Sequence, residues 1–209
     1  MNNTEKVINV KLKNKISDFS VNISEKIWKV EAKFTLDMIY WLISWWNILL
    51  SEIWRKLNEK ISIKQTVKRI SKNLFSFKSD YINEIKDNLL IQNKSKITKD
   101  TVITLDWWDI NKSWALKMEN LKTIHDGSTW KLELWYCLNS IVATNIDKEW
   151  KPKNIPLNLN LYSTKAKEFS SENHESIKSI DDVIKIIGNI WIWVFDRWYD
   201  RLRWIIKEL

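Results

Sequence analysis

The chain has 209 residues, 44% of them hydrophobic and 29% charged, which suffices for one large domain or two small ones and argues against intrinsic disorder. No stretch reaches the roughly 18 uncharged apolar residues of a membrane span, and the polar N-terminus lacks a signal-peptide core, so we expect a cytoplasmic protein without a membrane partner. The single cysteine, Cys137, excludes an internal disulfide, and His125 and His174 have no cysteines at ligand spacing, which argues against a zinc site.

Positive charge is concentrated in the first half of the chain. Residues 1–100 hold 19 Lys and Arg against 11 Asp and Glu, whereas residues 101–209 hold 15 of each, so the first half accounts for the whole net charge of +8. Such asymmetry is typical of a nucleic-acid-binding half joined to a half with another task. A basic surface that serves only solubility would give the same counts.

Tryptophan and glycine have exchanged their usual frequencies. The chain has 15 tryptophans and 2 glycines, whereas average usage predicts about fifteen glycines in a chain of this length. Many tryptophans stand where a turn or a close backbone approach would favour glycine, namely Trp45, Trp46, Trp107, Trp108, Trp150 and Trp198. We hypothesise that most tryptophans are UGA codons that mean glycine in the source bacterium, with Trp193, inside an apolar run, as the best candidate for a genuine tryptophan. The alternative is a Trp-rich module that stacks on sugars or bases.

The first half reads as a series of helices. Residues 1–27 are polar with scattered apolar positions and predict an arm or a weak helix. From Phe34 apolar residues recur at helical spacing, and after a break at residues 44–46, Asn47 is placed to cap a second helix. The buried residues predicted are Leu36, Ile39, Leu42 and Ile43 in the first helix and Leu50, Ile53 and Leu57 in the second.

A basic helix follows, and it begins at a capping box formed by Ser62 and Gln65. A helix, a short helix, a tight turn and a basic helix are the pattern of a helix-turn-helix DNA reader, although a row of lysines can also be a solvated surface. The predicted buried residues are Ile63, Val67, Ile70 and Leu74, and the predicted DNA-binding residues are Lys64, Gln65, Lys68, Arg69 and Lys72. A further helix from residue 78 and a polar linker at residues 92–99 complete a basic helical region over residues 1–99.

The second half, residues 100–209, mixes strands with helices. A β-branched run at residues 101–105 predicts a buried strand that ends on Asp106. We then expect a short helix at 117–124, two strands within 130–146 broken near Asn139 and Ser140, and a strand at 155–162. A helix at 173–187, a strand at 189–195 that ends on Asp196, and a closing helix with Leu202, Ile205, Ile206 and Leu209 complete the pattern.

Asp106 and Asp196 share one structural situation, since each follows a predicted buried strand. Reactive groups gather at the carboxyl ends of strands in sheets covered by helices, so these carboxylates would meet if the two strands are adjacent and parallel. Two converging carboxylates repel each other unless a cation lies between them, and Mg²⁺ prefers such oxygen ligands. An Asp at a strand end can equally form a turn or cap a helix.

Several segments follow one another in an order that resembles a known family. Residues 48–57 read ILLSEIWRKL, residues 104–112 read TLDWWDINK, and residues 194–200 read VFDRWYD; shorter segments lie at 117–121, 125–128, 156–157, 161–163 and 171–173. With Trp read as Gly at the turns, this ordered set resembles the bacterial insertion-sequence DDE transposases, whose catalytic core is RNase H-like. The stretch at 194–200, similar to VxDRGxD, is the most specific single motif.

The resemblance implies a chemistry and a partner. Asp106 and Asp196 would be two of three acidic ligands for Mg²⁺ or Mn²⁺, used to cut one DNA strand at the end of the element and to join the freed 3′ hydroxyl to target DNA. The partner would be double-stranded DNA in the nucleoid, bound by a homodimer on paired ends. Asp109 and Asp200 would lie behind the ligands or in turns. Arg197 would orient Asp196 or contact a phosphate, with a plain surface arginine as the alternative.

The resemblance has one departure. The family's third acid, a Glu on a downstream helix with Tyr and Arg nearby, has no match in these residues. We therefore expect an α+β protein with a helix-turn-helix-like region at 1–99 and an incomplete RNase H-like domain at 100–209. Such a truncated or split transposase would be inactive alone. The alternative function is a non-catalytic DNA-binding protein that uses the basic helical half.

Overall fold

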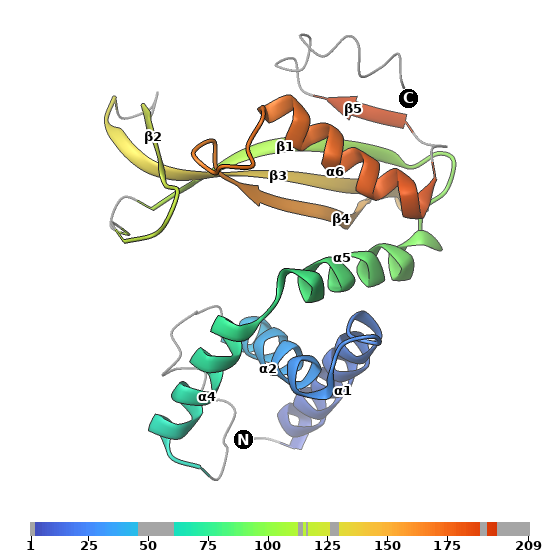
Figure 1. Ribbon diagram of the computed structural model, residues 1–209. Helices are drawn as coiled ribbons and strands as arrows, with labels where there is room; N and C mark the ends of the chain where they lie inside the picture. Colours follow the sequence, from blue (N-terminus) through green and yellow to red (C-terminus); the bar gives the residue numbers. More distant parts are fainter. Residues whose placement is uncertain are drawn as a thin grey trace. The chain divides into compact units, whose positions relative to one another are not determined.

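The computed structural model describes residues 3–45, 61–112, 115, 117–125, 130–188 and 192–195, and the chain divides into two compact units, Met1–Gln92 and Asn93–Leu209. Helices form the first unit, and a sheet with a covering helix forms the second (Figure 1). The described residues therefore have the α+β class that the sequence predicts. Within them, no helix is long and apolar enough to cross a membrane.

The first unit contains α1 (Asn3–Ile23), α2 (Lys29–Trp45), α4 (Ile63–Ser76) and most of α5 (Ser79–Lys94). The segment predicted as an arm or weak helix is thus mainly α1, which buries Ile16, Ser20 and Ile23 at spacings of four and three. Asn88 Nδ2 donates a hydrogen bond of 3.1 Å to the carbonyl oxygen of Ile23, which satisfies one of the last carbonyls of α1. The helix predicted after Asn47 lies outside the described residues.

The core of the first unit forms where α2 and α4 meet. It contains Phe34, Trp41 and Ile70, with Met38 and Phe77 packed against them. The prediction for α2 was wrong, because Leu36 and Ile39 are only half-buried and Leu42 and Ile43 are exposed. Residues 34–45 are apolar on nearly every side, so periodicity could not choose a face, and the large rings of Phe34 and Trp41 occupy the core instead.

Helix α4 begins at the predicted capping box. Ser62 Oγ accepts a hydrogen bond from the backbone N–H of Gln65, and Gln65 Oε1 accepts one from the backbone N–H of Ser62, both at 3.4 Å. Of the four apolar residues predicted to be buried in α4, only Ile70 is; Val67 is half-buried and Ile63 and Leu74 are exposed. The side turned inward is narrower than predicted and consists of Thr66 and Ile70.

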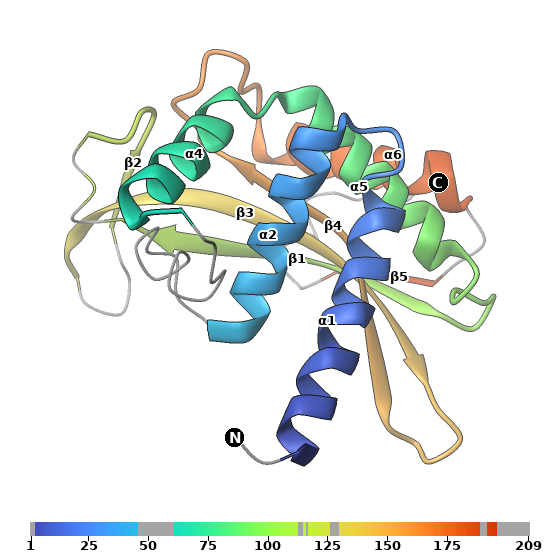
Figure 2. The ribbon, with the colours of Figure 1, turned by 90° about the horizontal axis from the view of Figure 1, so that it is seen from below.

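The second unit is built on a five-stranded sheet of β1 (Val102–Asn111), β2 (Lys122–His125), β3 (Leu132–Ile146), β4 (Pro152–Tyr162) and β5 (Ile192–Phe195). Strand β3 is central: one edge pairs antiparallel with β1, and the other edge pairs antiparallel first with β2 and then with β4. Strand β5 pairs with the free edge of β1 and runs parallel to it. Figure 2 shows this sheet from below, with β3 and β1 crossing the view side by side.

Three predictions in this unit were wrong. Strand β1 does not end on Asp106 but continues to Asn111, and residues 122–125 form β2 where a helix was predicted. Strand β3 is continuous through Asn139 and Ser140, where a break was predicted. All three differences have the same cause. β1 and β2 each pair with β3, and β3 pairs with strands on both of its edges. The backbone hydrogen bonds of these pairs outweigh the local preferences of the residues.

Helix α6 (Glu172–Ile187), predicted at 173–187, covers one face of the sheet. Ser171 caps its first turn, and Gly188, with φ of 100°, ends it in a conformation that favours glycine. The helix buries Ser176, Ser179, Ile180, Val183 and Ile187. The small serines let the sheet approach closely, so that the buried amides of Asn139 and Asn158 donate to the carbonyl oxygens of Glu175 and Ser179, each at 3.3 Å.

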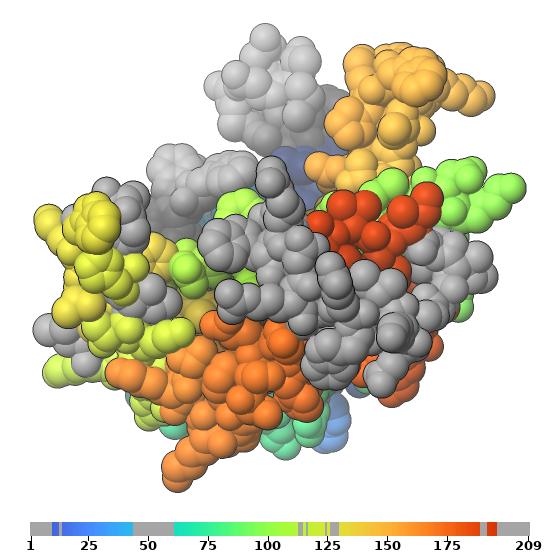
Figure 3. Space-filling model, turned by 90° about the horizontal axis from the view of Figure 1, so that it is seen from above, coloured from blue at the N-terminus to red at the C-terminus, as the bar shows by residue number. Residues whose placement is uncertain are grey.

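The hairpin between β3 and β4 turns through a residue in the left-handed region. Trp150 has φ of 61°, its N–H donates to the carbonyl oxygen of Asp147, and the N–H of Asp147 donates to the carbonyl oxygen of Lys151. A turn closed by a left-handed residue at this position is one that glycine favours. Figure 3 shows the hairpin tip, in gold, standing out at the edge of the view.

The tryptophans predicted to occupy positions that favour glycine differ in backbone conformation. Trp150 is at positive φ, and so is Trp130, with φ of 57°. Trp107 and Trp108 are regular strand residues opposite Asn139 and Leu138, so the prediction that they occupy a turn was wrong. Trp45 is the last residue of α2, and Trp46 and Trp198 lie outside the described residues.

Candidate metal centre and nucleic-acid interface

Asp106 lies in the middle of β1 with its side chain exposed. Its neighbours Leu105 and Trp107 belong to the face that α6 covers, since Leu105 is buried and the Trp107 indole nitrogen donates to Ser176 Oγ of α6 at 3.1 Å. Because side chains alternate along a strand, Asp106 belongs to the opposite face, together with Thr104 and Trp108. Asp106 Oδ1 accepts a hydrogen bond of 2.9 Å from the backbone N–H of Trp107.

The strand that precedes Asp196 is the neighbour of the strand that contains Asp106. Strands β1 and β5 are parallel, and their last described pair is Leu105 opposite Phe195. Asp106 and Asp196 are the next residues along the two chains. The adjacency and the direction that the metal hypothesis requires are therefore present, whereas Asp196 itself, with Arg197 and Asp200, lies outside the described residues.

Trp108 is the aromatic neighbour of Asp106 on the same face. It is exposed, and its indole nitrogen donates to Ser140 Oγ at 3.1 Å, while the Ser140 hydroxyl donates to the carbonyl oxygen of Asp106 at 3.5 Å. Trp107 turns to the face that α6 covers, so of the two adjacent tryptophans only Trp108 lies beside the carboxylate. A side chain of this size restricts how closely a nucleic-acid backbone can approach Asp106.

Asp109 lies on the face of α6 and not in a turn. It is opposite Cys137 on β3. Burial of the thiol, and next the negative charge of Asp109, raise the pKa of Cys137 to about 11. Glu172, at the start of α6, lies 3.9 Å from Lys122 of β2 and adds to this rise. The sequence did not indicate this polar cluster, since its members come from four separate elements.

The chemistry of Asp106 fits a hard divalent cation, because an exposed carboxylate is a ligand that Mg²⁺ prefers. The described residues supply one carboxylate to this site, and nowhere among them do three His, Cys, Asp or Glu side chains converge as a metal site. The second carboxylate would have to come from Asp196, the residue after β5.

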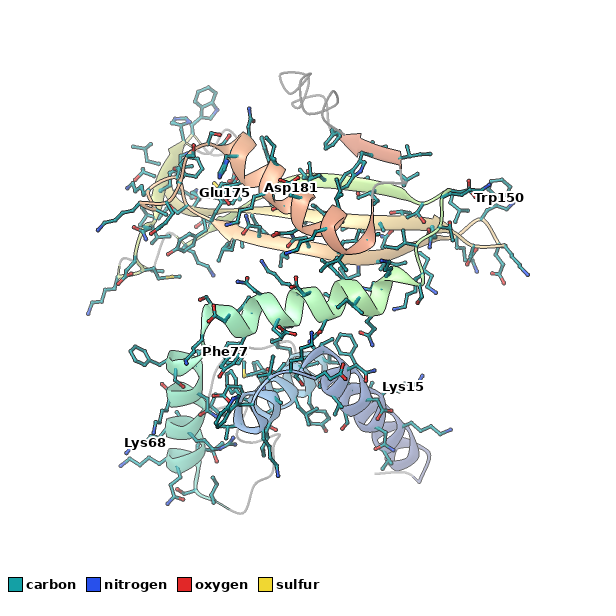
Figure 4. All side chains as sticks on the ribbon, turned by 45° about the vertical axis from the view of Figure 1, so that its right-hand side comes forward. Lys15, Lys68, Phe77, Trp150, Glu175 and Asp181 are labelled. Carbon is teal, nitrogen blue, oxygen red and sulfur yellow. The ribbon has the colours of Figure 1, made fainter. Side chains whose placement is uncertain are left out.

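Helix α4 displays the predicted basic residues in different ways. Lys64, Lys68 and Lys72 are exposed, and Figure 4 shows Lys68 extending away from the helix. Arg69 is less exposed, and one of its guanidinium nitrogens lies 3.4 Å from Asp37 Oδ2 of α2, so it joins the two helices. Gln65 caps its own helix. The three lysines are the members of the predicted set with a side chain available to a partner.

No protein-family model matches the chain, and a search of curated proteins finds no significant match. The functional argument therefore depends on the residues and on their arrangement.

Proposed function

We propose that the protein is a DNA transposase of the DDE type, which cuts DNA strands and transfers them with the help of Mg²⁺ or Mn²⁺. The observation that carries this proposal is the parallel pairing of β1 with β5, which brings the strand that contains Asp106 beside the strand that precedes Asp196. Asp106 lies inside β1 and not at its end, so the support for the proposal is this pairing and not a strand-end position. The proposal requires this pairing to continue by one residue, so that Asp106 and Asp196 face each other.

The cation would be held by Asp106 and Asp196, and it would activate water and stabilise the charge that develops on the phosphate. The protein's own contribution is to fix Asp106 on a paired strand, so that its carboxylate needs little reorganisation on binding a cation. The basic first unit, through the α4 lysines, would hold the DNA by its phosphates. A glycine in place of Trp108 would open the Asp106 face to the backbone of the DNA, as the codon hypothesis expects.

Cation binding tests the site without requiring catalysis. Titration with Mn²⁺, followed by the loss of its electron paramagnetic resonance signal, should give one class of site that Asp106→Ala and Asp196→Ala each weaken at least tenfold. Asp109→Asn is the matched control, since it removes a carboxylate from the same strand on the opposite face and should leave the affinity unchanged. Equal Mn²⁺ affinity of the wild type and Asp106→Ala would refute the site.

Strand cleavage is the second readout. Nicking of a supercoiled plasmid in the presence of Mn²⁺ should depend on Asp106 wherever it is detectable. Metal-dependent nicking by the wild-type protein that survives Asp106→Ala would assign the activity to other residues.

A non-catalytic DNA-binding role is the second candidate, and the exposed lysines of α4 favour it independently of the acidic residues. Alanine at Lys64, Lys68 and Lys72 should lower the slope of log affinity against log salt by about 0.9 for each phosphate that the variant no longer neutralises. Alanine at the exposed lysines Lys11, Lys15 and Lys29 removes the same charge from α1 and α2 and should leave the slope unchanged. Equal slopes for the wild type and the α4 variant would show that these lysines are only solvated.

A further inference from the structure

We propose that Phe75, in the last turn of α4, contacts the 5-methyl groups of thymines when α4 lies in the major groove of double-stranded DNA. This inference rests on the proposed DNA binding and adds to it a residue that reads base identity. Phe75 is 94% exposed, the highest value among the exposed large apolar side chains that the structure describes.

Phe75 lies on the same side of α4 as the three exposed lysines. It follows Lys64, Lys68 and Lys72 by eleven, seven and three positions, which are close to whole turns of the helix, so the four side chains share one side of α4. The inward side, Thr66 and Ile70, lies across the helix from them. The ring is therefore part of the cationic side and is not an extension of the core.

Charge identifies the occupant of this side. Residues 61–78 contain Lys64, Lys68, Arg69, Lys72 and Lys78 and no acidic residue. The side from Lys64 to Phe75 extends about 17 Å at the rise of an α-helix, and a helix of about 10–12 Å diameter fits the major groove, which is about 12 Å wide. Phosphates on the groove walls would pair with the lysines, and the apolar ring would lie towards the base edges.

Thymine is the base that matches the chemistry of Phe75. The thymine methyl is the apolar group that base pairs present in the major groove, and aromatic and aliphatic side chains contact it directly. A phenyl ring offers no hydrogen bond to guanine or adenine edges, so it discriminates through this methyl group alone. Removal of one buried methyl should weaken binding about three- to fivefold.

The experiment compares duplexes of alternating dA and dT with duplexes of alternating dA and dU, which differ in the thymine methyl. The wild-type protein should bind the dT duplex at least threefold more tightly, and Phe75→Ala should bind both with the affinity of the wild type for the dU duplex. Because Phe75 is almost fully exposed, Phe75→Ala should retain the wild-type unfolding midpoint. Leu74→Ala is the matched control, since Leu74 is the exposed neighbour on another side of the helix, and it should keep the preference for dT.

Equal affinity of the wild type for the two duplexes, or a preference that Phe75→Ala retains, overturns the inference. Either result leaves the DNA-binding proposal intact as long as binding weakens with salt and the α4 lysine variant reduces that dependence. Absence of salt-dependent binding to both duplexes would overturn the DNA-binding proposal itself.

Discussion

Replacement of Trp150 by glycine should stabilise the protein, although it removes the largest kind of side chain. Trp150 has φ of 61° in the β3–β4 turn, and a left-handed conformation costs an L-residue about 1–2 kcal/mol. Trp150 is 85% exposed, so its removal costs little burial. Figure 4 shows it at the tip of the hairpin. Glycine at this position lowers the free energy of unfolding by about 0.5–1 kcal/mol, because it gives the unfolded chain greater conformational freedom. The net expectation is a gain of about 0.8 kcal/mol, or about 3 °C in Tm.

Urea denaturation followed by circular dichroism measures this change. The matched control is Trp108→Gly, because Trp108 is also exposed but lies in regular strand, where glycine costs about 0.5–1 kcal/mol. This control variant also loses the hydrogen bond from the indole to Ser140. The two substitutions should therefore change the free energy of unfolding in opposite directions. A decrease in stability on Trp150→Gly would refute the reasoning from backbone conformation.

This result bears on the decoding of the gene. Where the protein with glycine is more stable than the protein with tryptophan, the conformation of the backbone supports a UGA codon read as glycine. The coding DNA decides the matter position by position, and a UGG codon at Trp150 would contradict the hypothesis there.

Other predictions concern single side chains. Trp41→Gly should lower the stability of the first unit by about 4 kcal/mol, because the ring is fully buried. We therefore expect a UGG codon at Trp41. A variant whose helical circular dichroism is lost at the same urea concentration as in the wild type would contradict this. At pH 8 the Cys137 thiol should react far more slowly with a disulfide reagent in the folded protein than in the protein unfolded by urea, because burial raises its pKa from 9.0 to about 11. The free energy of unfolding should therefore fall as the pH rises from 9 to 11. Asp37→Ala should cost about 1 kcal/mol in urea denaturation, because Asp37 pairs with Lys33 and Arg69, and an unchanged midpoint would make these ion pairs incidental.

Local signals in the sequence were sufficient for some elements. The capping box at Ser62 and Gln65 predicted where α4 begins, because both hydrogen bonds are formed within one turn of the chain. Apolar spacing predicted α6, and strand-like alternation predicted β4. The hairpin at Trp150 was also predicted as a turn, since charged residues and a proline surround it.

The predicted face of α2 shows where such signals fail. Apolar residues occur on nearly all sides of this helix, so several faces satisfy the helical repeat equally well. Packing against Ile70 of α4 selected Phe34 and Trp41, and it left Leu42 and Ile43 exposed. No pattern within α2 itself contains that choice.

The sequence by itself determined the charge asymmetry, the capping box that begins α4 and the presence of an aspartate after each of two apolar runs. Only the tertiary structure decided that β1 continues past Asp106, that Asp106 and Asp109 lie on opposite faces, and that β5 is the parallel neighbour of β1. Strand partners here are separated by tens of residues, and their backbone hydrogen bonds depend on which edges meet in the folded sheet.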